Sequence, residues 1–319
     1  MGRSKENGVV KWKRQGMRGI SEQRRLVEQE GRRHAVRRGL RGTLHFENMP
    51  RLHRMLDFLV RVTFTRAKGA RNALDVRAEE VEIAQGNLPG GFDNTRILLI
   101  TDLHIDGLDL LAEKVISIAG DVDYDFCILG GDYSFGAARE GSLAYSMMRD
   151  VATKLRARSR VFGVLGNHDR YSVAQLLDEC GVEMLMNESV CLEKDGDKIY
   201  LAGVDDCHYY GADDIALASS EIEDGAFKIL LCHSPEQYGQ AAKAGYSLYL
   251  TGHTHGGQIC LPGGFVVVHG ATVPRRLLKG RWRCDSMAGY TSRGAGASGV
   301  AVRYFCPPEI TIITLTKGQ

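Results

Sequence analysis

The stretch Arg96-Ile97-Leu98-Leu99-Ile100-Thr101-Asp102-Leu103-His104 decides the fold, because an apolar β-type run ends there in an aspartate and a histidine. A second such run, Leu248-Tyr249-Leu250-Thr251, ends in Gly252-His253-Thr254-His255. Between them, three further β-type runs end in polar segments: Gly130-Gly131-Asp132, Gly166-Asn167-His168-Asp169 and Cys232-His233. Open α/β sheets place their sites at the carboxyl ends of strands, so we expect these five segments to meet at one sheet edge.

Strand-like and helical segments alternate along the chain from Val76 onward. Strand-like runs fall near 78–84, 96–101, 126–130, 160–165, 182–185, 198–203, 228–232, 247–251, 265–269 and 310–315. Helical patterns fall near 108–119, 140–156, 172–180, 213–222 and 235–244. The alternation predicts an α/β fold with largely parallel central strands, and the short strands crowded into the last third predict a second sheet.

Charge is spread unevenly over the 319 residues. Residues 1–77 hold 20 lysines and arginines against 7 acidic residues, a net charge of +13, whereas residues 78–319 hold 21 against 32, a net charge of −11. We therefore predict a basic N-terminal extension over 1–77 and a separate, acidic domain over 78–319.

The extension itself has two parts. Residues 1–50 are rich in glycine and arginine and poor in apolar residues, which predicts a mobile or loosely helical segment. Residues 52–74 repeat apolar side chains near the helical period among many arginines, which predicts a basic amphipathic helix. Such a helix either lies in an anionic membrane interface or packs on the body with its arginines in solvent.

The cysteines and the hydropathy of the chain bear on the cellular compartment of the protein. The eight cysteines show no C-x-x-C pairing, which favours a reducing environment over a disulfide framework. No apolar run reaches the roughly 18 residues needed to cross a bilayer, and the first residues lack the apolar core of a secretory leader. We expect a cytoplasmic protein, peripheral on the inner membrane if the basic helix binds lipid.

The residue types in the five segments suit cations. Asp102 and His104 are two apart, so on a regular strand both would point the same way and could hold one cation. Asp132 follows two glycines and has two oxygens, so it could bridge two cations. Adjacent residues diverge, so Asn167 suits a metal whereas His168 suits a substrate. Together the segments predict a two-metal hydrolase.

The order D-x-H, G-D, G-N-H-D, H and G-H-x-H resembles the calcineurin-like metallophosphoesterase superfamily over residues 95–257. Flanking segments resemble one bacterial branch, which includes membrane-associated phosphodiesterases and UDP-2,3-diacylglucosamine pyrophosphohydrolases. These segments are Gly203-Val204-Asp205-Asp206, residues 252–259, Ser292-Arg293-Gly294 and residues 307–311. The resemblance implies a four-layer αββα sandwich of two mixed sheets, with the metals at the sheet edge.

The same resemblance implies a ligand set. Asp102, His104 and His255 would hold the first divalent metal, Asn167, His233 and His253 the second, and Asp132 would bridge them. His168 would face the phosphate, with Asp169 fixing its tautomer. Mixed nitrogen and oxygen ligation suits manganese first, with iron or zinc as alternatives. Many members carry a further aspartate shortly after the bridging one, where this chain has Tyr133-Ser134-Phe135.

Three more residues are candidates for substrate binding. Arg170 follows the His168 turn and could hold a second phosphate, or it could be solvated. Arg293 lies in a glycine-rich tract and could reach an anionic substrate. Asp206 could support the site or cap a helix equally well.

The reaction implied is attack on a phosphodiester or pyrophosphate bond by hydroxide that the metals generate. One substrate is UDP-2,3-diacylglucosamine, split to UMP and lipid X at a membrane that residues 1–77 would bind. The alternative is a soluble phosphodiesterase or phosphomonoesterase acting on nucleotides or other small phosphates. A non-catalytic, protein-binding relative would have lost ligands, and none is missing here. The acidic body disfavours nucleic acid as a partner.

Overall fold

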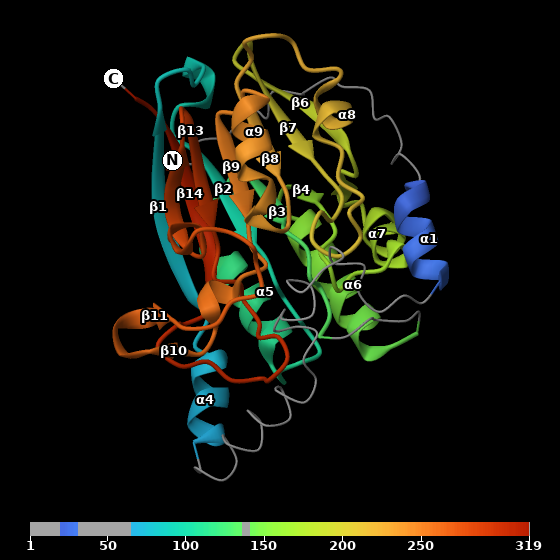
Figure 1. Ribbon diagram of the computed structural model, residues 1–319, viewed down its shortest axis with the longest axis vertical. Coiled ribbons are helices and arrows are strands. Elements are labelled where there is room, and N and C mark those ends of the chain that lie inside the picture. The colour runs from blue at the N-terminus through green and yellow to red at the C-terminus, as the bar shows by residue number, and fades with distance from the viewer. Residues whose placement is uncertain (1–19, 31–64, 136–140, 319) are drawn as a thin grey trace, which may run out of the picture.

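Two six-stranded β-sheets form the centre of the computed structural model, which describes residues 20–30, 65–135 and 141–318 (Figure 1). The first sheet has the order β1-β14-β2-β3-β4-β5. Its strands are β1 (Arg77–Gln85), β14 (Glu309–Lys317), β2 (Thr95–Ile100), β3 (Phe126–Leu129), β4 (Arg160–Gly163) and β5 (Glu183–Met184). β2 to β5 run parallel, whereas β14 is antiparallel to β2, so the sheet is mixed.

The second sheet has the order β12-β13-β9-β8-β7-β6. Its strands are β12 (Gly280–Cys284), β13 (Met287–Thr291), β9 (Leu248–Thr251), β8 (Lys228–Leu231), β7 (Asp197–Gly203) and β6 (Glu188–Lys194). The inner four strands are parallel, and an antiparallel strand closes each edge. A small hairpin, β10 (Cys260–Leu261) with β11 (Phe265–Val266), lies outside both sheets.

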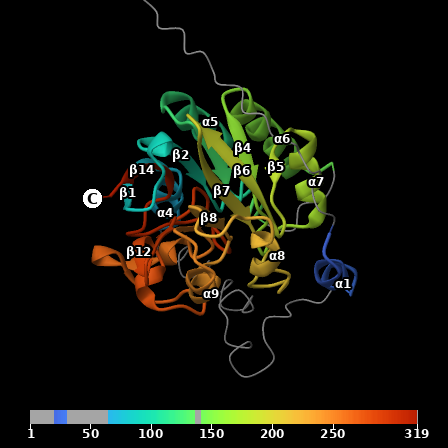
Figure 2. The ribbon, with the colours of Figure 1, turned by 90° about the horizontal axis from the view of Figure 1, so that it is seen from above.

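Alternating side chains give each sheet two apolar faces. In β2, Ile97 and Leu99 pack between the sheets, while Leu98 and Ile100 pack under helices. The helices of that layer are α5 (Leu111–Asp121), α6 (Leu143–Arg156) and α7 (Tyr171–Glu179). The shorter α8 (Ile215–Ser219) and α9 (Tyr238–Lys243) cover the second sheet (Figure 2). The layers are therefore helix, sheet, sheet, helix, which confirms the predicted α/β sandwich of two mixed sheets.

Three strands of the second sheet were not predicted, although the sheet itself was. β6 is an edge strand with many partly exposed side chains, so its apolar content is low. β12 and β13 form a hairpin, and β13 overlaps the start of the glycine-rich tract that contains Arg293. Edge strands and hairpins with few apolar residues give a weak periodic signal.

The N-terminal extension is described in part. Helix α1 (Glu22–Glu30) packs its Val27 against Tyr210 and Ala212 of the body. Of the two expectations for this segment, mobile or loosely helical, the structure shows a packed helix at these residues. Helix α4 (Arg66–Ala73) falls within the predicted amphipathic helix, whose residues 52–64 lie outside the described residues. Among the residues described, no helix is long and apolar enough to span a membrane.

Candidate metal centre

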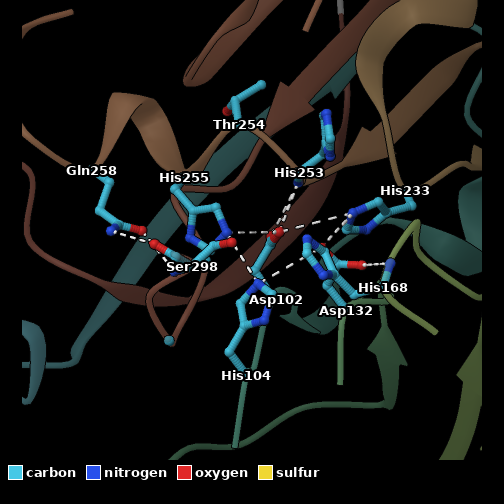
Figure 3. Close-up of polar contacts among 12 residues, drawn as sticks. Asp102, His104, Asp132, His168, His233, His253, Thr254, His255, Gln258 and Ser298 are labelled. Carbon is cyan, nitrogen blue, oxygen red and sulfur yellow. Dashed lines mark hydrogen bonds and ion pairs between the residues drawn. The ribbon is translucent and has the colours of Figure 1, made fainter. Parts of the chain in front are cut away.

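The five polar segments meet where the parallel strands of both sheets end. Asp102, Asp132 and Asn167 follow β2, β3 and β4, which are neighbours in the first sheet. His233 and His253 follow β8 and β9, which are neighbours in the second. The backbone N–H of His253 donates to both oxygens of Asp102, at 2.9 and 3.1 Å, and so joins the two sheet edges. The predicted gathering at one edge is what the structure shows (Figure 3).

Five of the seven predicted metal ligands have left-handed backbone. Their φ angles are 52° at Asp102, 39° at His104, 55° at Asp132, 69° at His253 and 49° at His255. Residues with a Cβ seldom adopt this region, and such strain gathers at functional sites because the surrounding structure must hold it. β2 ends at Ile100, so Asp102 and His104 converge through these turns and not through the regular strand spacing that we assumed.

The first group of side chains comprises Asp102, His104 and His255. The two imidazole Nε2 atoms lie 3.2 Å apart, and Nε2 of His255 lies 3.5 Å from Asp102 Oδ1. The side chains of Asp102 and His104 are fully buried. One carboxylate and two imidazoles this close together make a site for a divalent cation.

The second group comprises Asp132, His233 and His253. Nε2 of His233 lies 3.2 Å from Asp132 Oδ2. Asn167 joins this group, because its Oδ1 lies 2.9 Å from Nδ1 of His253. The two groups contain the same residues that the resemblance assigned to two metals.

Asp132 belongs to the second group and also lies close to the first. Its Oδ2 is 3.2 Å from His233 Nε2 in one group and 3.6 Å from His104 Nε2 in the other. The same oxygen is 4.0 Å from Nε2 of His168, whose side chain keeps 28% of its surface exposed. His168 therefore faces the centre from the solvent side, where a substrate would approach.

Two imidazoles are held in the tautomer that a metal ligand needs. Nδ1 of His104 lies 2.8 Å from the Ser134 carbonyl, and Nδ1 of His233 lies 2.7 Å from the Gly130 carbonyl. A carbonyl only accepts, so each Nδ1 donates and each neutral ring directs the Nε2 lone pair into the centre. The donor set therefore fits divalent cations.

Burial and neighbouring charges shift the pKa values of the ligand side chains. Burial lowers the pKa of His104 to about 4, and burial with the neighbouring His104 lowers the pKa of His255 well below its usual range. Burial also opposes the charged forms of Asp132 and His233. Their mutual attraction outweighs it, lowering the pKa of Asp132 and raising that of His233. A cation would compete with protons for these ligand atoms, so metal affinity should fall as the pH is lowered.

Asp169 has different partners from those expected. Its carboxylate accepts the backbone N–H groups of Asp132, Tyr133 and Gly166 at 2.8, 2.9 and 2.8 Å. It is fully buried, so these donors replace its hydration. Asp169 therefore holds the backbone of the Asp132 and His168 turns, whereas we expected it to fix the His168 tautomer.

The three substrate candidates are placed differently. Arg170 is exposed beside the His168 turn, and its role there stays a prediction. Arg293 forms ion pairs with Glu79 and Glu309, so its charge is already balanced. Asp206 accepts the backbone N–H groups of residues 208, 209 and 210 in a turn, whereas the helix that follows, α8, is capped by Asp214. The expected helix cap at Asp206 is therefore wrong.

Two residues near the ligands gave no signal in the sequence. Arg303 is fully buried and donates to the carbonyls of Arg293, Gly294, Gly296 and His255. It thereby fixes the loop behind His255. Glu236 lies 3.0 Å from Nδ1 of His208, whose ring centroid is 4.3 Å from that of His253. Both depend on contacts between distant segments, which spacing does not reveal.

Gly252 allows the close approach of Asp102, and Gly252→Ala is expected to weaken metal binding. A methyl group there would collide with Oδ2 of Asp102 and lie 2.7 Å from Oγ1 of Thr101. Displacing the carboxylate should lower metal affinity about 10–100-fold, the usual cost of disturbing groups around a metal. Calorimetric titration with Mn²⁺ measures this. Gly239→Ala is the control, since a methyl group there meets nothing within 4 Å. Unchanged Mn²⁺ affinity in Gly252→Ala would contradict the assignment of Asp102.

The amino-acid sequence of the chain is similar to those of known proteins. The profile of the calcineurin-like phosphoesterase family matches residues 95–257. The metallophosphoesterase YkoQ of Bacillus subtilis (strain 168) is 28% identical over 264 residues, covering 80% of this chain and 96% of that protein. YkuE, a metallophosphoesterase of the same strain, is 30% identical over 75% of this chain and 85% of its own length. The phosphodiesterase YaeI of Escherichia coli (strain K12) is 28% identical over 69% of this chain and 82% of its own length.

Proposed function

The chain belongs to the calcineurin-like phosphoesterases, the metal-dependent hydrolases of phosphate esters, and we propose that it cleaves a phosphodiester or pyrophosphate bond. The observation that carries this proposal is the pair of buried ligand groups that meet at Asp132, with His168 at their solvent side. A partly exposed imidazole beside a buried, charged centre has access to a phosphate without being a ligand itself.

The proposed roles of the chain's residues follow from their positions. Asp102, His104 and His255 would hold one cation, Asn167, His233 and His253 the other, and Asp132 both. When bound, the two cations would polarise phosphoryl oxygens and lower the pKa of a water molecule. His168 would donate a hydrogen bond to a phosphoryl oxygen or a proton to the leaving group. Manganese is our first candidate, and iron or zinc the next, because the ligands are nitrogen and oxygen atoms.

We further propose a lipid-linked substrate, with UDP-2,3-diacylglucosamine cleaved to UMP and lipid X as the leading case. An exposed apolar surface near the centre supports this. Leu261, Phe265, Val267, Val268 and Phe305 each expose about half of their surface, between 48% and 59%. All but Phe305 belong to the apolar hairpin, residues 260–268, which follows His255 closely: the Cys260 thiol donates to the Gly256 carbonyl at 3.3 Å.

Cations flank this apolar surface. Residues 259–284 contain five lysines and arginines and no acidic residue, although the body as a whole is acidic. Helix α4 packs its Gly69 against Tyr304, whose carbonyl accepts from the backbone of Cys260, so α4 and the apolar hairpin share one end of the molecule (Figure 1). α4 exposes Arg66, Lys68 and Arg71. Apolar side chains among cations suit the interface of an anionic bilayer, so we propose that this end binds the cytoplasmic face of the inner membrane.

Incubation with UDP-2,3-diacylglucosamine and Mn²⁺ tests the substrate. Formation of UMP and the acylated sugar phosphate, lost in Asp132→Asn, is the expected result. Metal-dependent hydrolysis of bis(p-nitrophenyl) phosphate without turnover of the lipid would discard that substrate. It would leave a soluble enzyme acting on nucleotides or other small phosphates.

The double variant Phe265→Ser/Val268→Ser is expected to lose binding to vesicles that contain phosphatidylglycerol. Both side chains are exposed and would enter the interface, where each buried methylene contributes roughly 0.8 kcal/mol. Pelleting the full chain with these vesicles measures binding. Leu217→Ser, an exposed leucine on α8, is the matched control. Equal pelleting of all three proteins, or equal binding to neutral phosphatidylcholine, would reject this surface.

A further inference from the structure

Helix α1 lies beside α7, which begins shortly after the His168 turn, although α1 comes from a segment far outside residues 95–257 (Figure 1). Its Arg24 has no exposed surface, whereas its neighbour Arg25 is exposed. A fully buried arginine in a short helix of a basic, mostly polar segment needs specific partners, because an unpaired buried charge is very unfavourable. The partners of Arg24 therefore indicate what the helix does.

Arg24 makes three kinds of contact. Its Nε donates to both oxygens of Asp205 at 2.9 Å, and its Nη2 donates to Oδ1 at 2.6 Å. Its Nη1 donates to the backbone carbonyl of Asp169 at 2.8 Å. Its guanidinium carbon lies 3.8 Å from the centroid of the Tyr210 ring. Lysine cannot reproduce these contacts, because they use several N–H groups of the planar guanidinium and also its face, which stacks on the ring.

The carbonyl that Arg24 holds belongs to the residue directly after His168. The Tyr210 hydroxyl donates to the same carbonyl at 3.1 Å. Two residues further on, the backbone N–H of Tyr171 donates to Glu28 of α1 at 2.8 Å. Helix α1 therefore holds residues 169 and 171 on either side of Arg170.

The fixed segment is continuous with the ligands. The Asp169 side chain accepts from the backbone of Asp132 and Gly166, and the backbone N–H of His168 donates to Asp132 Oδ1 at 3.0 Å. A shift of the Asp169 peptide would therefore move Asn167 and His168 relative to Asp132. Displacements of about 1 Å at a reacting group are enough to slow catalysis strongly.

We propose that Arg24 is a positioning residue for hydrolysis, acting through the Asp169 carbonyl to hold the turn that carries Asn167 and His168. The inference rests on the proposed function. It makes α1 a working part of the active centre, although the helix supplies no ligand.

Three full-length variants test it: Arg24→Ala, Arg24→Lys and the control Arg25→Ala. With bis(p-nitrophenyl) phosphate and Mn²⁺, Arg24→Ala is expected to lose kcat about 10–100-fold with little change in KM, as for groups that orient metal ligands. Arg24→Lys keeps the positive charge facing Asp205 but not the several donors of the guanidinium, so its loss of kcat should be intermediate. Added methylguanidinium should partly restore Arg24→Ala and leave the original protein unchanged. Arg25→Ala should behave like the original protein.

Hydrogen exchange followed by mass spectrometry gives a readout that does not need turnover. Peptides covering residues 164–172 should exchange faster in Arg24→Ala than in Arg25→Ala, while peptides from β8 and β9 stay protected. Unchanged exchange and unchanged kcat in Arg24→Ala would overturn the proposal. If Arg24→Ala does not fold, the same two readouts on Arg24→Lys decide. Absence of hydrolysis by the original protein would refute the proposed function, whereas the exchange result would still decide whether Arg24 holds the turn.

Discussion

Asp132→Asn is expected to reduce kcat/KM by roughly 10³-fold and to remove at least one cation. The carboxylate lies 3.2 Å from His233 and 3.6 Å from His104, so it serves both ligand groups. Asparagine keeps the shape of the side chain but removes the negative charge that two bound cations would share. Metal ions contribute several kcal/mol of charge stabilisation to the transition state, and each loss of about 1.4 kcal/mol is tenfold in rate. Steady-state kinetics together with metal analysis of the purified variant measure both effects.

Asp224→Asn is the matched control for this substitution, because Asp224 is an exposed aspartate in the loop before β8. It should keep full activity and full metal content. An Asp132→Asn protein that binds as much Mn²⁺ as the original and retains its rate would show that Asp132 does not bridge the two groups.

His168→Gln is expected to lower kcat by roughly 10²–10⁴-fold, the usual range for a general acid or base, while metal content stays unchanged. His168 faces Asp132 at 4.0 Å but belongs to neither ligand group. If it protonates the leaving group, the loss should be greatest for substrates with a poor leaving group. The measurement is kcat for a series of aryl phosphodiesters with leaving groups of different pKa.

The control for His168→Gln is His269→Gln. His269 is a partly buried histidine whose Nδ1 bonds to the Ala271 carbonyl, outside the ligand groups. It should retain normal rates across the series. A His168→Gln protein that loses a cation would instead identify His168 as a ligand, and an equal loss for all leaving groups would assign it to charge stabilisation.

The meeting of the five polar segments could be predicted from the sequence because each follows a buried strand, whereas the division of their side chains into two ligand groups came from the family resemblance. An apolar run followed by Asp, Asn or His is a local signal, and parallel strands bring such ends together. The route by which Asp102 and His104 converge was not predictable. Their left-handed backbone is held by hydrogen bonds to the carbonyls of residues 131 and 132 in the loop after β3. Contacts between distant segments leave no local pattern in the sequence.

The contacts of Asp169 and Arg24 show where local patterns fail. Asp169 was expected to face the His168 ring, but its carboxylate accepts hydrogen bonds from three backbone N–H groups of two different turns. Arg24 lies in a basic segment whose composition predicts solvent-exposed side chains. Its burial is favourable only because of contacts with Asp205 and Tyr210, which are distant in the sequence. Composition averages over such individual residues, whereas a single complementary carboxylate determines where the helix packs.

Because the ligands come from both sheets, the centre has a thermodynamic consequence for the whole fold. Asp102, His104, Asp132 and Asn167 belong to the edge of one sheet, and His233, His253 and His255 to the edge of the other. A cation that binds this folded arrangement and not the unfolded chain adds roughly 2.7 kcal/mol of stability at a free concentration 100 times its Kd. The cellular supply of metal would therefore set how long the protein survives proteolysis, as well as how fast it works.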